Sequence, residues 1–285
     1  PFGLKGWQAA FMLVALPGLV MSFWVATLRE PIRGQVDGIY EKPNLHPFRE
    51  VGGMLMSMVP IANIRVHSAH GAGSRGAIIN IVITLIIVAI TYGLIQLTGA
   101  VLQWVSLGIG FYAIACWTQT LAARDPVTVG MIFKCQTMLC LIIGAAMIVF
   151  GGAANFWLIP YLQRHYGVSA TEVGAVLGTG QVVLGIVGVI AGGLLADWLR
   201  GYTGRGKLYV VLVAATASTL STLVLLMTDK LIVAYGAYFV MALLGPMLIG
   251  PLVSTISDLV LPRSRATTNS FFITMQTLFG FALAP

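Results

Sequence analysis

The fold class is decided by residues 192–207, which read GGLLADWLRGYTGRGK. The first half of this stretch is apolar except for Asp197, and the second half carries the cations Arg200, Arg205 and Lys207. Long apolar segments flank it on both sides. A short charged loop between two such segments is typical of a turn at a membrane surface, where one spanning helix ends and the next begins.

The composition of the whole chain agrees with this interpretation. Of its 285 residues, 58% are hydrophobic and 9% are charged, and the mean hydropathy is +0.92. Soluble domains carry about 25% charged residues, so this chain has too few charges to cover a soluble fold of its size. We therefore predict a polytopic membrane protein. The apolar runs are continuous and not alternating, which predicts an all-α fold and not a barrel.

Eight segments approach the roughly 20 apolar residues that a spanning helix needs. They are 7–28, 77–98, 101–121, 131–163, 170–199, 208–227, 231–261 and 267–285. The long connection 29–76 contains a short apolar run at 51–62, which is too short to span. We expect that run to lie in the membrane interface or under the helices, with a solvated linker as the alternative.

The cations predict which loops share a side of the membrane. If 7–28 ends in the cytosol, every Lys and Arg lies at the cytosolic face except Lys5, Arg164 and Lys230. This asymmetry is the positive-inside pattern. It accounts for the net charge of +7 and excludes nucleic acid as the expected partner. Because the chain starts and ends at proline beside or within apolar segments, we expect an internal piece of a larger protein.

Local motifs predict how several helices begin, pack and bend. Residues 169–172, Ser-Ala-Thr-Glu, form a capping box that starts the fifth span. Glycines at 174 and 178, and at 188 and 192, place small residues on one face, which permits close helix approach. In the seventh span, 245–246 and 250–251 are both Gly-Pro, which weakens the helix.

Four motifs together resemble the major facilitator superfamily of secondary transporters. Gly193, Asp197, Arg200 and the GRGK of 204–207 resemble the loop signature of this family, with Trp198 at a position where a cation usually stands. The other three motifs lie in the family's order along the chain. They are GWQAAF at 6–11 with Pro-Gly at 17–18 and Arg-Glu-Pro at 29–31, NFWLIPY at 155–161 with Gly-Val-Ser at 167–169, and DLVLP at 258–262 with Arg-Ala-Thr at 265–267. The last of these is similar to the spinster-like branch in particular.

The resemblance implies a major-facilitator-type bundle and a division of the chain. Residues 1–28 would be the last helix of the N-terminal half, and 29–76 the cytosolic loop between the halves. Residues 77–121 would be an inserted transmembrane hairpin, and 122–285 would be helices seven to eleven of a truncated C-terminal half. Helices one to five and helix twelve would belong to missing parts of the same protein.

The resemblance also implies a gating loop centred on Asp197. An acid at the cytosolic end of a helix can interact with the N-terminus of a neighbouring helix, where partial positive charge favours it. Arg200 or Arg205 can pair with Asp197 or with another loop acid. The expected gating residues are Gly193, Asp197, Arg200, Arg205, Lys207 and Arg265. The alternative is that Asp197 merely ends the apolar span and the cations only set the topology.

A transport pathway needs polar groups that face the interior of the bundle. The candidates are Asn155, Trp157, Gln181, Tyr235, Tyr238, Asn269 and Gln276. For each of them, a hydrogen bond between helices is an equal alternative. None of the eight predicted spans has an acid or a cation at mid-depth, so a carboxylate for proton coupling would lie in the missing half.

The expected function is secondary active transport of a small organic or amphipathic solute by alternating access. Symport and antiport both stay open, and so does proton coupling. We expect a multi-pass protein of the bacterial inner (plasma) membrane, surrounded by lipid, with no cofactor. A channel or a structural membrane subunit is the alternative. Enzyme function is not expected, and His67 and His70 alone supply too few ligands for a metal site.

Overall fold

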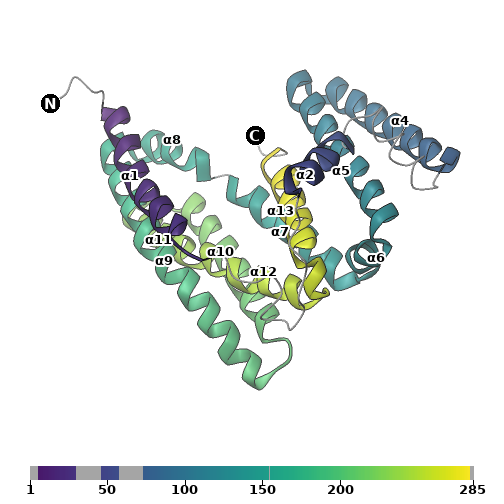
Figure 1. Cartoon of the computed structure of the whole chain (residues 1–285). Coiled ribbons are helices and arrows are strands. Elements are labelled where there is room, and N and C mark those ends of the chain that lie inside the picture. The colour runs from purple at the N-terminus through teal and green to yellow at the C-terminus, as the bar shows by residue number, and fades with distance from the viewer. Residues whose placement is uncertain (1–5, 30–45, 58–72, 154, 283–285) are drawn as a thin grey trace. The chain divides into compact units, whose positions relative to one another are not determined.

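The structure is a computed structural model that describes residues 6–29, 46–57, 73–153 and 155–282 (Figure 1). These residues form helices and connecting turns, with no strand among them. The chain divides into two units, residues 1–47 and 48–285. The first unit contains α1 (Gly6–Ala26), an apolar helix with Pro17 inside it.

The second unit contains the other helices, which follow one another with short connections. After α2 (Pro47–Ser57), they are α4 (Gly73–Thr98), α5 (Val101–Arg124), α6 (Pro126–Lys134), α7 (Gln136–Ala153), α8 (Asn155–Tyr166), α9 (Ala170–Tyr202), α10 (Gly206–Met227), α11 (Leu231–Met247), α12 (Ile249–Asp258), the 3-10 turn η1 (Pro262–Ser264) and α13 (Arg265–Ala282).

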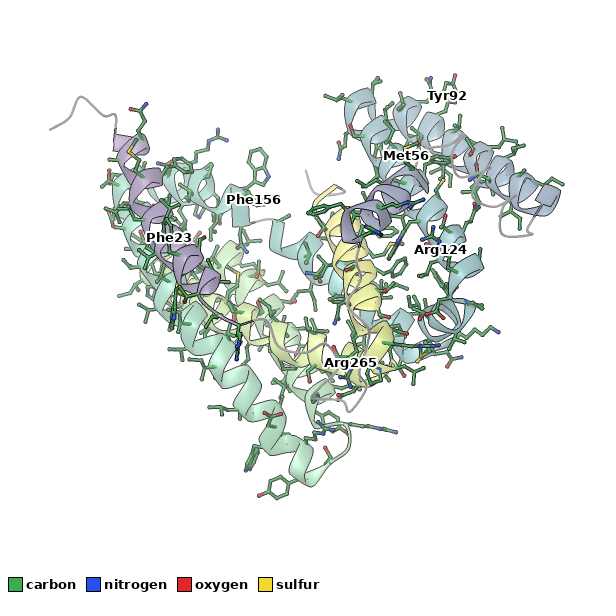
Figure 2. The ribbon with its side chains drawn as sticks, viewed as in Figure 1. Phe23, Met56, Tyr92, Arg124, Phe156 and Arg265 are labelled. Carbon is green, nitrogen blue, oxygen red and sulfur yellow. The ribbon has the colours of Figure 1, made fainter. Side chains whose placement is uncertain are left out.

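Six stretches of the described residues are helical, long and apolar enough to cross a membrane. They are Gly76–Thr98, Val101–Arg124, Gln136–Tyr166, Ala170–Tyr202, Gly206–Met227 and Leu231–Asp258. They match the second to seventh predicted spans, and the first and last predicted spans form α1 and α13, of 21 and 18 residues. Many large apolar side chains project outward, as Phe23 on α1 does with 76% of its surface exposed (Figure 2). Together these features define an integral multi-pass membrane protein with an all-α fold.

Two of the predicted spans are each divided into shorter helices. The predicted span 131–163 differs at its start, because Cys135 has an extended backbone that separates α6 from α7. The predicted span 231–261 is divided at Leu248, between its two Gly-Pro pairs, as α11 and α12. The Leu248 N–H there donates to the Gly245 carbonyl at 3.3 Å. Proline removes a backbone donor, so the position of this break follows from the sequence.

Helix α2 covers the beginning of the short apolar run predicted for the interface. Its Phe48, Val51 and Leu55 recur at helical spacing and are all exposed. One exposed apolar face on a short helix is the pattern of an interfacial helix. Residues 58–62 of the run lie outside the described residues.

The helices of the second unit bury two apolar clusters. In one cluster, α9, α10 and α11 pack together with α8, around residues such as Leu162, Val173 and Tyr238. In the other, α13 packs on α7, and residues of α6, α10 and α12 complete the core around Phe272 and Ile256.

Glycines set how closely α9 approaches α11. A Cβ atom on Gly188 would lie 2.1 Å from the Leu243 carbonyl oxygen, and one on Gly192 would lie 2.2 Å from the Met247 carbonyl oxygen. Nothing lies within 4 Å of a Cβ on Gly174 or Gly178. The predicted close approach is therefore confirmed at the second glycine pair, and the first pair has no such contact among the described residues.

Contacts between loops group the helix ends into two sets. The connections after α5, α9 and α12 form one set, joined by polar contacts of Asp125 and Asp258. The connections after α8 and α10 form the other, where the Tyr166 hydroxyl donates to the Thr228 carbonyl and His165 lies 3.8 Å from Asp229. The cation pattern predicts the same grouping. The capping box is also present, with the Ser169 hydroxyl accepting the Glu172 N–H at 3.2 Å.

Alanine substitutions in α9 should separate glycines that hold the helices together from those that do not. Gly188→Ala forces a methyl group into a backbone carbonyl, and overpacking of this kind costs about 1–3 kcal/mol. Gly178→Ala meets no neighbour and should be neutral or stabilising, because alanine favours the helix. Thermal unfolding of the two purified variants in detergent measures the difference. Equal stability of the two would contradict the close α9–α11 contact.

Candidate functional site

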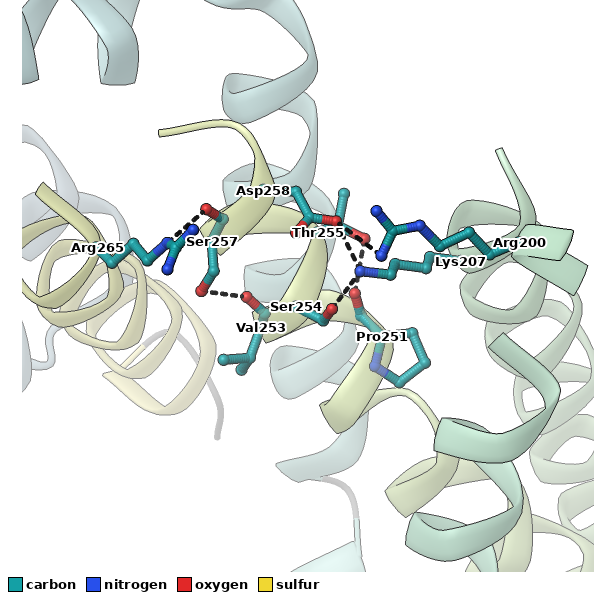
Figure 3. Close-up of polar contacts among 9 residues, drawn as sticks. All are labelled: Arg200, Lys207, Pro251, Val253, Ser254, Thr255, Ser257, Asp258 and Arg265. Atoms are coloured by element: carbon teal, nitrogen blue, oxygen red, sulfur yellow. Dashed lines mark hydrogen bonds and ion pairs between the residues drawn. The ribbon is translucent and has the colours of Figure 1, made fainter. Parts of the chain in front are cut away.

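The polar centre at the cation-rich end of the bundle is Asp258, the last residue of α12 (Figure 3). The Lys207 ammonium donates to Asp258 Oδ2 at 2.6 Å and also contacts the Ser254 hydroxyl. Arg200 Nη1 lies 3.9 Å from the same carboxylate oxygen. One carboxylate thus joins the last turn of α9, the first turn of α10 and the end of α12.

The α9–α10 turn brings the two cations to this carboxylate. Helix α9 ends at Tyr202, and the next residue, Thr203, caps it by donating its N–H to the Leu199 carbonyl at 2.9 Å. A Cβ on Gly206 would lie 2.4 Å from the Leu199 carbonyl carbon, so only glycine fits where α10 starts against α9. This tight turn places Lys207 in the interior with 8% of its surface exposed. Because a buried cation is costly unless it is paired, Asp258 is the partner that makes this position tolerable.

Two hydrogen bonds from α13 add to these contacts. Arg265, at the start of α13, donates from Nε to the Ser257 carbonyl at 3.2 Å, and so satisfies a carbonyl in the last turn of α12. Asn269, one turn later, donates to the Ser257 hydroxyl at 3.1 Å. These two bonds attach α13 to the end of α12.

A second polar contact joins the start of α6 to the turn before α13. Asp125 caps α6 by accepting the Thr128 N–H at 3.1 Å and the Thr128 hydroxyl at 2.5 Å. The Thr128 hydroxyl also lies 2.6 Å from that of Ser264, and Arg263 Nη2 lies 4.0 Å from Asp125 Oδ1. The hydrogen bonds from Thr128, aided by the charge of Arg263, lower the pKa of Asp125 below its ordinary value of 3.8.

The contacts select one of the two alternatives predicted for Arg200, which is pairing with another loop acid. Among the described residues, no hydrogen bond or ion pair reaches the exposed Asp197, and Arg200 and Lys207 pair with Asp258 instead. The reason is helical periodicity. Gly192 and Ala196 are buried on the face of α9 toward α11 and α12, and Arg200 continues that face at the next i+4 position. Asp197 lies about 100° around the helix from Ala196 and about 60° from Arg200.

The other predicted gating residues also differ in whether they take part in these contacts. Gly193 has nothing within 4 Å of an added Cβ, and Arg205 is an exposed residue at the start of α10. Arg265 belongs to the α12–α13 contact. The contacts thus involve three of the six predicted residues, and add Asp258, Ser254, Ser257 and the Asp125 cap, which sequence reasoning missed. The available signal was that Asp258 and Asp125 are acids at helix ends on the cation-rich side.

The predicted pathway residues are dispersed over several helices. Only Gln181 and Tyr238 are joined: the Tyr238 hydroxyl donates to the Leu177 carbonyl at 2.9 Å and lies 3.3 Å from Gln181 Oε1. Asn155 and Trp157 are exposed at the start of α8.

The remaining pathway candidates lie on α11 and α13. Tyr235 on α11 has a buried hydroxyl with no hydrogen-bond partner among the described residues. Asn269 contacts α12, and Gln276 is half-buried on α13.

Metal ligands do not gather in the part of the chain that the structure describes. No group of three or more His, Cys, Asp or Glu side chains there could hold a metal ion. His67 and His70 lie outside the described residues.

Comparison with known proteins gives one informative similarity. The chain is 30% identical over 149 residues to an MFS-type efflux pump of Mycolicibacterium smegmatis (strain ATCC 700084 / mc(2)155). The match covers 50% of this chain and 34% of the relative, so it spans about a third of that protein's length. No protein-family model matches the chain, and no solved structure matches it.

Removing the Asp258 charge should destabilise the bundle more than removing the Asp197 charge. Asp258→Asn leaves the buried Lys207 ammonium without its counter-charge, which should cost about 1–3 kcal/mol. Asp197→Asn removes an exposed charge and should leave stability nearly unchanged. Thermal unfolding in detergent measures both variants. A Lys207→Met/Asp258→Asn double variant should recover stability, because no buried charge is then left unpaired. Equal unfolding temperatures for the two single variants would contradict this assignment.

Acid should weaken the α6 cap through Asp125. The pKa of Asp125 is lower in the folded state than its ordinary value of 3.8. Its ionised carboxylate therefore stabilises the fold at pH values well above 3.8, and this stabilisation is lost as the pH falls toward the lowered folded pKa. Asn retains the cap but does not titrate. The stability difference between the wild type and Asp125→Asn should therefore shrink as the pH falls through this range. Unfolding measured from neutral to acid pH tests this, and a constant difference would contradict it.

Proposed function

We propose that this chain is part of a major facilitator superfamily transporter that moves a small organic or amphipathic solute by alternating access. The similarity to the MFS-type efflux pump and the family motifs support the superfamily. The relative's name supports outward transport as the direction. The division into helices six to eleven with an inserted hairpin, and the spinster-like branch, rest on the sequence motifs.

The observation that carries the proposal is the Asp258 contact together with the helix break beside it. Alternating access requires one end of a bundle to close by contacts that can be broken again. Asp258 connects three helix ends, and it lies one helix segment beyond the interruption at Leu248. A helix divided by Gly-Pro pairs can change its angle there without breaking a regular hydrogen-bond ladder.

The strength of these contacts suits a reversible closure. The Asp258 side chain is 47% exposed and that of Arg200 is 59% exposed, and exposed ion pairs contribute about 0–1 kcal/mol. The Lys207 contact is better shielded and keeps α10 and α12 together. We propose that the Arg200 contact breaks first, when the cation-rich end opens.

Asp197 has a separate place in this proposal. Its exposed carboxylate lies at the same end of α9 as Arg200, on the adjoining face about 60° around the helix. We propose that this face closes against the N-terminal half of the same protein, and that the Asp258 contact acts within the C-terminal half. Proton coupling would use a carboxylate elsewhere in the protein, because no acid lies at mid-depth in the predicted spans.

Counterflow in proteoliposomes of the whole protein tests this function. Unlabelled solute on one side should accelerate the uptake of a fluorescent amphipathic organic anion on the other, because a carrier exchanges solutes and a channel does not. Asp258→Asn and Asp197→Asn should slow exchange with little change in the half-saturating concentration. Asp229→Asn, at the opposite set of helix ends, is the matched control. Uptake without exchange acceleration would indicate a channel, and no uptake would indicate a structural subunit.

A further inference from the structure

The helices of the predicted inserted hairpin line an apolar cavity that is partly open to the surroundings and that the proposed transport cycle does not use. The cavity has a volume of about 590 Å³ and lies between α4, α5, α6 and α13. Its walls are almost entirely aliphatic and aromatic, and include Ile87 and Leu94 on α4, Trp104 and Phe111 on α5, and Phe279 on α13.

The cavity is long and follows the axes of the helices. On α4 its wall runs from Ile83 to Leu94, and on α5 from Trp104 to Gln119. At a rise of 1.5 Å per residue these rows are about 16 and 22 Å long. Half of the hydrocarbon core of a bilayer is about 15 Å thick. The cavity therefore matches the length of one acyl chain in one leaflet.

Small residues keep this space open while the helices stay in contact around it. A Cβ on Gly108 would lie 2.7 Å from the Thr91 hydroxyl oxygen, so α4 and α5 approach closely at this level. A Cβ on Gly110 would lie 2.7 Å from a methyl group of Leu278, so α5 approaches α13 as well. Ala115 then leaves room further along the same wall.

The two ends of the cavity differ in polarity. Near one end, Tyr112 donates to Asn80 Oδ1 at 3.0 Å, and Asn80 donates to Gln119 Oε1 at 3.2 Å. Just beyond that end, the exposed cation Arg124 occupies the last turn of α5. A second exposed cation, Lys134 in the last turn of α6, directly follows Phe133, which is part of the cavity wall. The other end, at Leu94 and Trp104, carries no charge.

We propose that this cavity binds one acyl chain of an anionic phospholipid from the leaflet on the cation-rich side. The chain would lie between α4, α5 and α13, and the phosphate would lie at the Gln119 end, with Arg124 and Lys134 as its cations. Such an occupant matches the length, the apolar walls and the charge at one end. A zwitterionic lipid fits the walls equally well but gains less from the two cations, so charge selectivity is the distinguishing property. This lipid site does not depend on the proposed transport function.

Photolabelling of the whole protein in nanodiscs tests the site. The probes are phosphatidylglycerol and phosphatidylcholine that carry the same diazirine on one acyl chain, with labelled peptides mapped by mass spectrometry. Phosphatidylglycerol should label peptides of α4, α5 and α13 that line the cavity. Ala115→Phe fills the cavity and should reduce this labelling severalfold. Ala89→Phe, on an exposed part of α4 outside the cavity, is the matched control and should label like the wild type.

The charge requirement is tested on the surface, where folding is not at risk. A cation near a membrane surface contributes a factor of about five to the binding of an anionic lipid. Arg124→Gln and Lys134→Gln should each reduce phosphatidylglycerol labelling by about that factor and leave phosphatidylcholine labelling unchanged. Equal labelling by the two lipids in the wild type would overturn the proposal. Unchanged labelling of Ala115→Phe would overturn it too, as would a second segment of the same protein mapped in the cavity.

Discussion

Lys207 imposes the constraint on which the cation-rich end of the bundle depends. Its ammonium group is buried where α10 begins against α9, and a cation in that position needs a counter-charge. Asp258, which lies 51 positions further along the chain, supplies this counter-charge. The tight turn at Gly206 serves the same pair, because it brings Lys207 to the start of α10 against α9.

The contact also requires that α12 be a separate segment from α11. The break at Leu248 lies between two Gly-Pro pairs, and the glycines of α9 let α11 lie against α9 up to Met247. Beyond that point the chain continues as α12, with residues in contact with α7 and α13 as well as α9. The chain packs closely against α9 on one side of the break and makes polar contacts on the other side. As a result, α11 belongs to one apolar cluster and α12 to the other.

The sequence predicts the class of fold well because that prediction depends on local properties. Hydrophobic length, cation asymmetry, the Ser169 cap and the Gly-Pro pairs each act within a few residues, and the helices follow them. The candidate site depends on which helix faces meet, and that is not local. The four-residue spacing of Gly192, Ala196 and Arg200 predicts that Arg200 lies on the packed face of α9. The sequence does not predict its partner Asp258, because no pattern indicates that α12 ends beside the turn between α9 and α10.

The solvent exposure of the side chains around Asp258 decides how easily their ion pairs form and break. A closure made of fully buried charges would be costly to form and costly to break, whereas a set of fully exposed pairs contributes almost nothing. Here one cation is buried and the other is largely exposed, and both share one carboxylate oxygen. Arg200 can therefore leave while Lys207 keeps the carboxylate neutralised. In the proposed cycle, a step that opens this end would leave no buried charge without a partner, which would limit its free-energy change to the few kcal/mol that a population shift between two conformations requires.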